Sequence, residues 1–109
     1  MVYTGGWIVV LITTPSRDEA YKISRVLIEE KLAACINIVE SVHSIFWWKG
    51  NIEESGEALM IVKTRIDKLD KLIETVKKHH SYTVPEIIAL PIIAANPDYL
   101  KWLDESITQ

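Results

Sequence analysis

Hydrophobic residues recur along this chain with two periods, one typical of strands and one typical of helices. Residues 7–14 form a β-branched apolar run, which predicts a strand buried on both faces. Residues 34–48 follow a period of two, and residues 52–64, with the apolar segment 58–62 at their centre, predict the returning strand of a long hairpin. Residues 86–90 predict a fourth strand, which ends at Pro91 or lies at a sheet edge, because proline donates no ladder hydrogen bond.

Two irregularities are expected within the hairpin. Its turn falls at residues 49–51, where Gly50 and Asn51 tolerate positive φ. Glu40 and Ser41 interrupt the apolar face of the first strand, which predicts a β-bulge at that point.

A helix is predicted between the first two strands. Ser16 can act as its N-cap and Glu19 can complete a capping box, and the helix ends near Lys31. Its inward positions follow helical spacing: Ala20, Ile23, Val26 and Leu27.

Two further helices are predicted in the second half of the chain. Asp67 is the expected cap of one, which ends by fraying at residues 79–81. Its inward positions are Leu69, Leu72, Ile73 and Val76. The other begins with Asn96 as cap and Pro97 at the first helical position, and continues through residues 99–103.

The predicted order is therefore β-α-β-β-α-β followed by a short helix, which is the ferredoxin-like arrangement of the α+β class. The 109 residues suit a single domain that spans residues 1–109. An unbroken strand over residues 34–48 would measure about 50 Å, whereas a domain of this size has a diameter of roughly 35 Å. The hairpin must therefore bend or project.

The hairpin tip carries three consecutive aromatic residues, Phe46, Trp47 and Trp48. Neighbouring strand residues point to opposite faces, so these rings cannot all be covered by one side of a small subunit. We expect them to lie in an oligomer interface, in a closed ring where each hairpin extends a neighbour's sheet. A monomer with a bent hairpin is the alternative.

Composition narrows the class of protein. The formal net charge is −3, with 12 basic and 15 acidic residues interspersed, which argues against nucleic-acid binding. No apolar run is long enough to cross a bilayer, and the first residues do not have the pattern of a signal peptide. With Cys35 as its single cysteine, the chain can form no internal disulfide, so we expect a soluble cytoplasmic protein.

Several segments together resemble the CutA divalent-cation tolerance family. They are Cys35-Ile36-Asn37-Ile38, residues 44–52 (SIFWWKGNI), Lys63-Thr64, residues 79–88 (HHSYTVPEII) and residues 99–103 (YLKWL). The resemblance implies a cytoplasmic homotrimer of ferredoxin-like subunits, similar in assembly to the PII signalling proteins and linked to tolerance of copper and other divalent metals. It does not imply an organic cofactor.

The resemblance also suggests a copper site, with two departures. Members with assigned copper ligands carry paired histidines, present here as His79 and His80, and a cysteine in the first strand, where this chain has Ile12. The soft thiolate that favours copper is therefore missing. The usual His-Pro-Tyr reads His-Ser-Tyr here, and Ser81 does not fix φ as proline does.

Each candidate ligand has a structural alternative. Adjacent histidines diverge by about 100° on a regular helix, so His79 and His80 could be exposed side chains that interact with the helix dipole. Cys35 could be a small hydrophobic residue of the strand. His43 is more readily explained as a hydrogen-bonded interface residue than as a ligand.

If the resemblance holds, Cys35, Lys63, Tyr82, Glu86 and Trp102 gather at a cleft between subunits. Their mixture of cation, phenol, carboxylate and indole suits a small anionic or zwitterionic molecule, or alternatively an interface network.

The leading hypothesis is a non-enzymatic trimer that binds divalent cations weakly. The second is a PII-like sensor with a metabolite in the clefts between subunits. The third is a small enzyme that uses Tyr82 and Glu86 as acid and base, although the chain has no phosphate loop, zinc-protease helix or nucleophile elbow.

Overall fold

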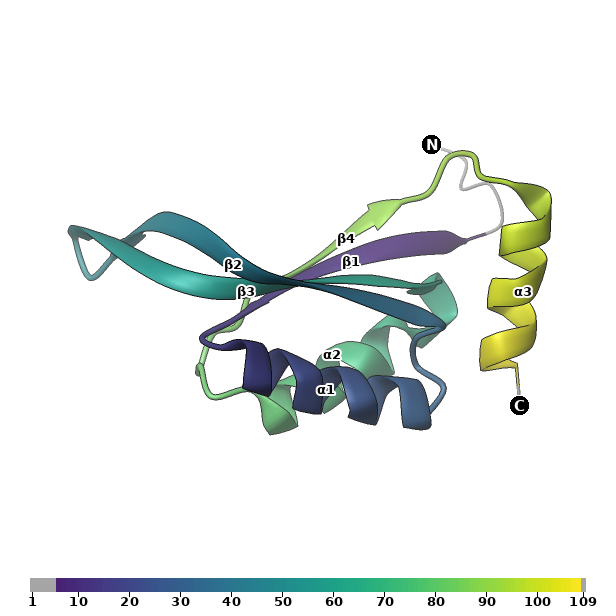
Figure 1. Cartoon of the computed structure of the whole chain (residues 1–109), viewed down its shortest axis with the longest axis horizontal. Helices are drawn as coiled ribbons and strands as arrows, with labels where there is room; N and C mark the ends of the chain where they lie inside the picture. Colours follow the sequence, from purple (N-terminus) through teal and green to yellow (C-terminus); the bar gives the residue numbers. More distant parts are fainter. Residues whose placement is uncertain (1–5, 109) are drawn as a thin grey trace.

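The computed structural model describes residues 6–108 and contains one four-stranded antiparallel sheet (Figure 1). The order across the sheet is β2-β3-β1-β4. The strands are β1 (Trp7–Thr14), β2 (Cys35–Trp48), β3 (Asn51–Arg65) and β4 (Ile87–Pro91). The predicted ferredoxin-like α+β fold is confirmed, and β4 lies at an edge, where Pro91 removes no donor that the sheet needs.

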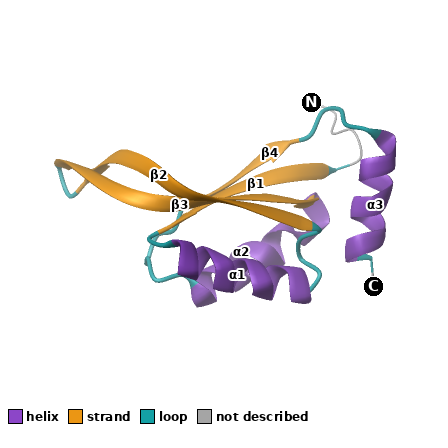
Figure 2. Cartoon of the chain, viewed as in Figure 1, coloured by secondary structure: helices purple, strands orange, loops and turns teal. Residues whose placement is uncertain are grey.

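Two helices cover one face of the sheet and a third lies at its end (Figure 2). They are α1 (Arg17–Glu29), α2 (Leu69–His79) and α3 (Pro97–Ile107). None of the helices within residues 6–108 is long and apolar enough to cross a membrane.

The core lies between the sheet and the helices α1 and α2. Alternate residues of β1, from Ile8 to Thr14, are at most 2% exposed, whereas the residues between them are half-buried. The prediction that this strand is buried on both faces is therefore wrong for a single subunit, because no helix covers most of its second face.

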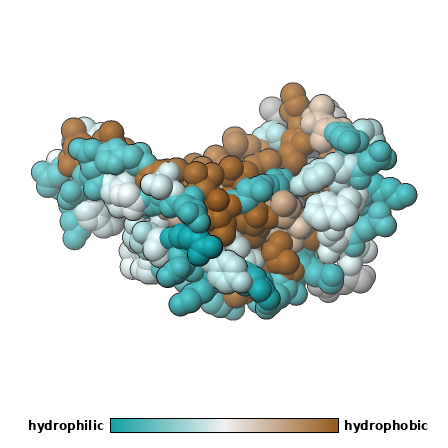
Figure 3. All heavy atoms as spheres, viewed as in Figure 1, coloured by the Kyte–Doolittle hydropathy of each residue, from teal (hydrophilic) through white to brown (hydrophobic). Residues whose placement is uncertain are grey.

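The second face of the sheet is apolar, and we call it the open face. Its members are identified by the strand register, since directly paired residues share a face. They include Val9, Leu11, Val39, Leu59, Ile61, Ile88 and Leu90. Three of them, Val39, Ile88 and Leu90, are 40–48% exposed, and Figure 3 shows hydrophobic residues along the side of the sheet away from α1 and α2.

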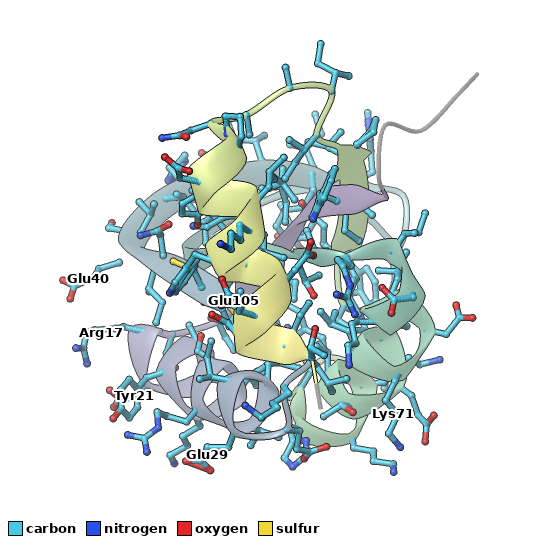
Figure 4. All side chains as sticks on the ribbon, turned by 90° about the vertical axis from the view of Figure 1, so that its right-hand side faces the viewer. Arg17, Tyr21, Glu29, Glu40, Lys71 and Glu105 are labelled. Carbon is cyan, nitrogen blue, oxygen red and sulfur yellow. The ribbon has the colours of Figure 1, made fainter. Side chains whose placement is uncertain are left out.

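The predicted bulge in β2 is confirmed. The pairing of β2 with β3 shifts between Val39 and Val42, and Glu40 at this point accepts a hydrogen bond of 2.7 Å from Arg17 of α1 (Figure 4). Beyond the bulge the hairpin projects from the globule, and the molecule including the hairpin extends 44 Å along its longest axis (Figure 1). The hairpin thus projects, as its length required.

The first helix begins as predicted, with one difference. Ser16 Oγ accepts a hydrogen bond from the backbone N–H of Glu19. The Glu19 carboxylate does not close the capping box, because its Oε2 accepts two hydrogen bonds from Ser81 instead. This carboxylate therefore connects the start of α1 to the segment after α2.

Two local predictions are wrong. Asp67 lies in a 3₁₀ turn (Ile66–Lys68) and accepts hydrogen bonds from Arg65, so it does not cap α2. In the hairpin turn Gly50 has the predicted positive φ (80°), but the second residue with positive φ is Lys49 (49°) and not Asn51, which already belongs to β3.

Candidate functional site

The end of α2 places its two histidines in different surroundings. His79 is the last helical residue and is exposed, whereas the side chain of His80, in extended backbone, is 0% exposed. His79 Nδ1 donates to the carbonyl oxygen of Thr75 at 2.9 Å, one turn earlier. Its Nε2 has no hydrogen-bond partner within residues 6–108.

His80 uses both ring nitrogens inside the subunit. Nε2 lies 2.7 Å from the carbonyl oxygen of Thr13, which can only accept, so Nε2 carries the proton. Nδ1 accepts from the backbone N–H of Tyr82 at 3.0 Å and lies 3.5 Å from Glu19 Oε2. The ring therefore joins the end of β1 to the segment that follows α2.

Tyr82 extends this network to the hairpin. Its hydroxyl donates to Oε2 of Glu57 in β3 at 3.0 Å, and its ring lies 5.0 Å from that of His80. Burial, and then the hydrogen bond to Glu57, raise the pKa of Tyr82 above its ordinary value. The raised pKa keeps the phenol protonated, so that it remains a donor to this carboxylate.

A cleft of about 890 Å³ lies beside Tyr82, between the hairpin and residues 81–86. Aromatic rings, hydroxyl groups and four glutamates line it, and Glu86 is one of them. Such a volume is in the range of small-molecule sites.

A second group of polar residues lies at the opposite end of the sheet, where α3 packs. Cys35 pairs with Lys63 across the strands, and the Lys63 ammonium donates to Asn37 Oδ1. Cys35 lies near Tyr99 of α3, and burial followed by the proximity of the Cys35 thiol raises the pKa of Tyr99. The Trp102 ring packs against the Tyr99 ring in a tilted arrangement, with 5.4 Å between the ring centroids.

Within one subunit, the five residues expected at a common cleft form two groups. Cys35, Lys63 and Trp102 belong to the α3 end, whereas Tyr82 and Glu86 belong to the hairpin end. Lys63 lies six positions after Glu57, the partner of Tyr82, which corresponds to about 20 Å along β3. Their convergence across subunits stays a prediction.

Sequence reasoning missed Glu57, the acceptor of the Tyr82 hydroxyl, which is only 8% exposed. The sequence contained one weak signal. Glu57 directly precedes the apolar segment of β3, so its carboxylate lies next to positions that are expected to be buried. Tyr99 was missed as the partner of Cys35, since nothing in the sequence relates these distant positions.

The aromatic hairpin tip is exposed in the single subunit. Phe46, Trp47 and Trp48 are 40%, 72% and 50% exposed, respectively, and Lys49 Nζ lies 5.9 Å from the centroid of the Trp48 ring. Their predicted place in an oligomer interface stays a prediction.

Comparison with known proteins agrees with this fold. Residues 8–106 match the family described as CutA1 divalent ion tolerance protein. The chain belongs to the CutA1 family. The resemblance found in the sequence is thereby confirmed.

Relatives of this CutA1 chain occur in distant organisms. It is 52% identical to the divalent-cation tolerance protein CutA of Thermus thermophilus, over 90% of this chain and 95% of that protein. It is 48% identical to the chloroplastic protein CutA 1 of Oryza sativa over 91% of its length, but spans only 56% of that longer protein. The structure of the periplasmic CutA of Archaeoglobus fulgidus superposes with a TM-score of 0.91 at 45% identity, covering 94% of this chain and 99% of that one.

The donor atoms of this chain do not form a ready copper site within one subunit. Residues 6–108 contain no group of three or more His, Cys, Asp and Glu side chains placed to hold a metal ion. Ile12 is fully buried, and both nitrogens of His80 already have partners. Only Nε2 of His79 is left as an imidazole donor at the end of α2.

Proposed function

We propose that this CutA1 chain is a cytoplasmic, non-enzymatic homotrimer that acts in divalent-metal tolerance and binds metal ions, including copper, weakly. The names of its relatives support the metal-tolerance role. The unpaired thiol of Cys35 supports a reducing compartment, although related proteins are named as chloroplastic and as periplasmic.

The free Nε2 of His79 is the observation that carries the metal proposal. A neutral imidazole nitrogen is a good ligand for Cu²⁺, and a single one gives weak binding unless another subunit adds donors. His80 contributes to the same site only by giving up its bond to Thr13 or to Tyr82. This cost is a physical reason for weak affinity.

Calorimetry with Cu²⁺ tests the assignment. His79→Ala should abolish most of the copper uptake, and His80→Ala is measured beside it. The chain has three histidines, so His43→Ala is the matched control that removes an exposed imidazole elsewhere. Copper uptake that is unchanged after the double change at His79 and His80 would overturn the assignment, and a loss of uptake in the control would point to His43 instead.

The metal affinity should also depend on pH. Imidazole must be neutral to bind a metal, so copper affinity should fall below about pH 6. An affinity that is unchanged between neutral and acidic buffer would point to carboxylate ligands instead.

Association of subunits through the open face would explain why its side chains are apolar. Apolar side chains of β1, β3 and β4 lie there without a covering helix, and β2 and β4 are the two edges of the sheet. A second copy would cover the apolar side chains and pair the free edges. The resemblance to CutA proteins is the basis for three copies.

Mass measurement in solution, by sedimentation or light scattering, tests this assembly. Leu90→Glu on the open face should dissociate the trimer, since a charge would enter the interface. Tyr21→Glu on α1 is the matched control, because both native side chains are 47% exposed. A native chain that sediments as a monomer would remove the proposal, as would equal dissociation in both variants.

A further inference from the structure

The carboxylate of Glu19 holds the segment that follows α2. Its Oε2 accepts a hydrogen bond of 3.0 Å from the backbone N–H of Ser81 and one of 3.1 Å from the Ser81 hydroxyl. The same oxygen lies 3.5 Å from Nδ1 of His80. Hydrogen bonds to an ionised carboxylate are roughly twice as strong as those between neutral groups. We call the two bonds from Ser81 to Glu19 the Glu19 clamp.

The start of α1 fixes the position of this carboxylate. Glu19 is the third residue of the helix, and its backbone N–H donates to Ser16 Oγ at 3.2 Å. The positive end of the helix dipole stabilises a negative charge in the first turn. The Glu19 side chain is only 20% exposed, so it is an enclosed anchor and not a mobile surface group.

The clamp restrains the neighbouring residue, His80. Its side chain is 0% exposed, and both ring nitrogens have partners within the subunit. For this ring to reach a metal ion beside His79, the backbone of residues 80–82 has to move, because adjacent side chains at the end of a helix point in different directions. Ser81 lies in the middle of that segment, so the clamp opposes the movement.

Glu19 is better placed to hold this segment than to bind a metal ion. Its Oε2 already accepts two hydrogen bonds. Residues 6–108 contain no group of three or more His, Cys, Asp and Glu side chains arranged around a common point. Glu19, His79 and His80 therefore do not form a ready set of ligands, although they lie close together in the fold.

We propose that Glu19 is a positioning residue that keeps His80 away from a metal ion bound by His79, and thereby limits the end of α2 to one imidazole donor. This inference rests on the proposed metal binding through His79 and explains why its affinity is low. The contacts of the clamp lie within one subunit and are already closed, so they do not depend on which surface a second copy covers.

Calorimetry with Cu²⁺ on the purified full-length assembly tests the sign of the effect. Glu19→Ala opens the clamp and should raise the copper affinity roughly tenfold, because His80 can then add a nitrogen without breaking two charge-assisted bonds. Loss of a ligand or of an attractive charge would lower the affinity instead. Glu105→Ala, which removes an exposed carboxylate of α3 (Figure 4), is the matched control and should leave the affinity unchanged.

The gain in affinity should depend on His80. His80→Gln supplies no imidazole, but its amide can still donate to the carbonyl of Thr13. Glu19→Ala combined with His80→Gln should therefore bind copper as the native protein does. The nitrogen hyperfine pattern in the electron paramagnetic resonance spectrum of bound Cu²⁺ should indicate one more imidazole in Glu19→Ala than in the native protein.

Ser81→Ala gives a second measurement that removes no charge and carries the test if Glu19→Ala does not fold. It loses one of the two bonds of the clamp, so the copper affinity should rise by a smaller factor. Without metal, hydrogen exchange of the Tyr82 amide, which donates to His80, should be faster in both variants. Thermal unfolding and mass measurement check that the fold and the assembly are retained.

The inference is overturned if opening the clamp leaves the copper affinity unchanged or lowers it, or if the gain persists in the variant that also carries His80→Gln. Failure of the proposed function has a different signature, because the native protein would then take up no copper through His79. In that case, copper uptake that appears in Glu19→Ala and disappears with His80→Gln would still support the clamp, whereas no uptake in either variant would remove both proposals.

Discussion

The indole Nε1 of Trp7 donates a hydrogen bond of 2.9 Å to Oδ1 of Asp104, 97 residues later in the chain. The same oxygen accepts from Arg65 Nη1 at 3.3 Å. One carboxylate on α3 thus connects the first residue of β1 with the last residue of β3. The position of α3 on the sheet depends on this oxygen together with the buried Leu103 and Ile107.

Asp104→Ala should therefore loosen α3. The change leaves the half-buried indole N–H of Trp7 without its acceptor, so the free energy of unfolding should fall by about 1–3 kcal/mol. Denaturant unfolding measures the loss, and hydrogen exchange should show faster exchange in α3. Asp104→Asn keeps an acceptor oxygen and should lose less; equal losses in both variants would contradict the role given to the hydrogen bond.

The two histidines of α2 should differ in their effect on stability. His80→Ala removes an enclosed ring and leaves the Thr13 carbonyl and the Tyr82 amide without partners, so it should cost on the order of 3 kcal/mol. His79→Ala, at an exposed position, should change stability by less than about 0.5 kcal/mol. Thermal denaturation of the metal-free protein compares them, and a similar cost for both would disagree with the structure.

Ser24 on α1 should be better replaced by alanine. Its Oγ is buried and has no hydrogen-bond partner within the described residues. Ser24→Ala removes this unsatisfied hydroxyl and improves helix propensity, so stability should rise by about 0.5–1 kcal/mol. Thr64→Val provides the contrast, because Thr64 Oγ1 donates to the carbonyl of Leu32 at 2.7 Å and its loss should destabilise by about 1 kcal/mol. Urea titration resolves differences of this size.

Tyrosine ionisation should show a late phase at alkaline pH. Burial raises the pKa of Tyr82 and of Tyr99, with further contributions from Glu57 and Cys35, respectively. A folded-state pKa above the unfolded value means that the folded protein holds the proton more tightly. The resulting stabilisation is complete below about pH 10 and is lost as pH rises through the folded-state pKa.

Ultraviolet absorbance of phenolate measures this ionisation. Tyr82→Phe should remove part of the late phase, and adding Tyr99→Phe should remove the rest. An unchanged late phase in the double variant would show that neither phenol is the source.

Local patterns predicted most of the fold because the deciding interactions are themselves local. Ser16 and Asn96 cap helices through hydrogen bonds to residues two or three positions away, and both were recognisable from the sequence. The position of β1 was predicted correctly, but the burial of its second face was not. That burial depends on whether another element packs on this side of the sheet, and a local sequence pattern does not contain this information.

The candidate site was less predictable because its contacts join distant segments. Glu19 had a local interpretation as the second half of a capping box, and the contact with Ser81 replaced it. The hydrogen bond between Tyr82 and Glu57 likewise depends on the path of residues 81–86 past the hairpin. The resemblance to the family indicated which residues of this region to consider. Only the structure shows that these residues form two separate groups within one subunit.

The β-bulge at Glu40 divides β2 into two halves with different surroundings. Residues before it belong to the pairing that supports the core, whereas residues after it pair only within the projecting ribbon. A substitution near the tip of the far half should therefore change the stability of the isolated globule little. Its effect should fall instead on contacts between copies, so the ribbon separates the stability of the fold from the strength of the assembly.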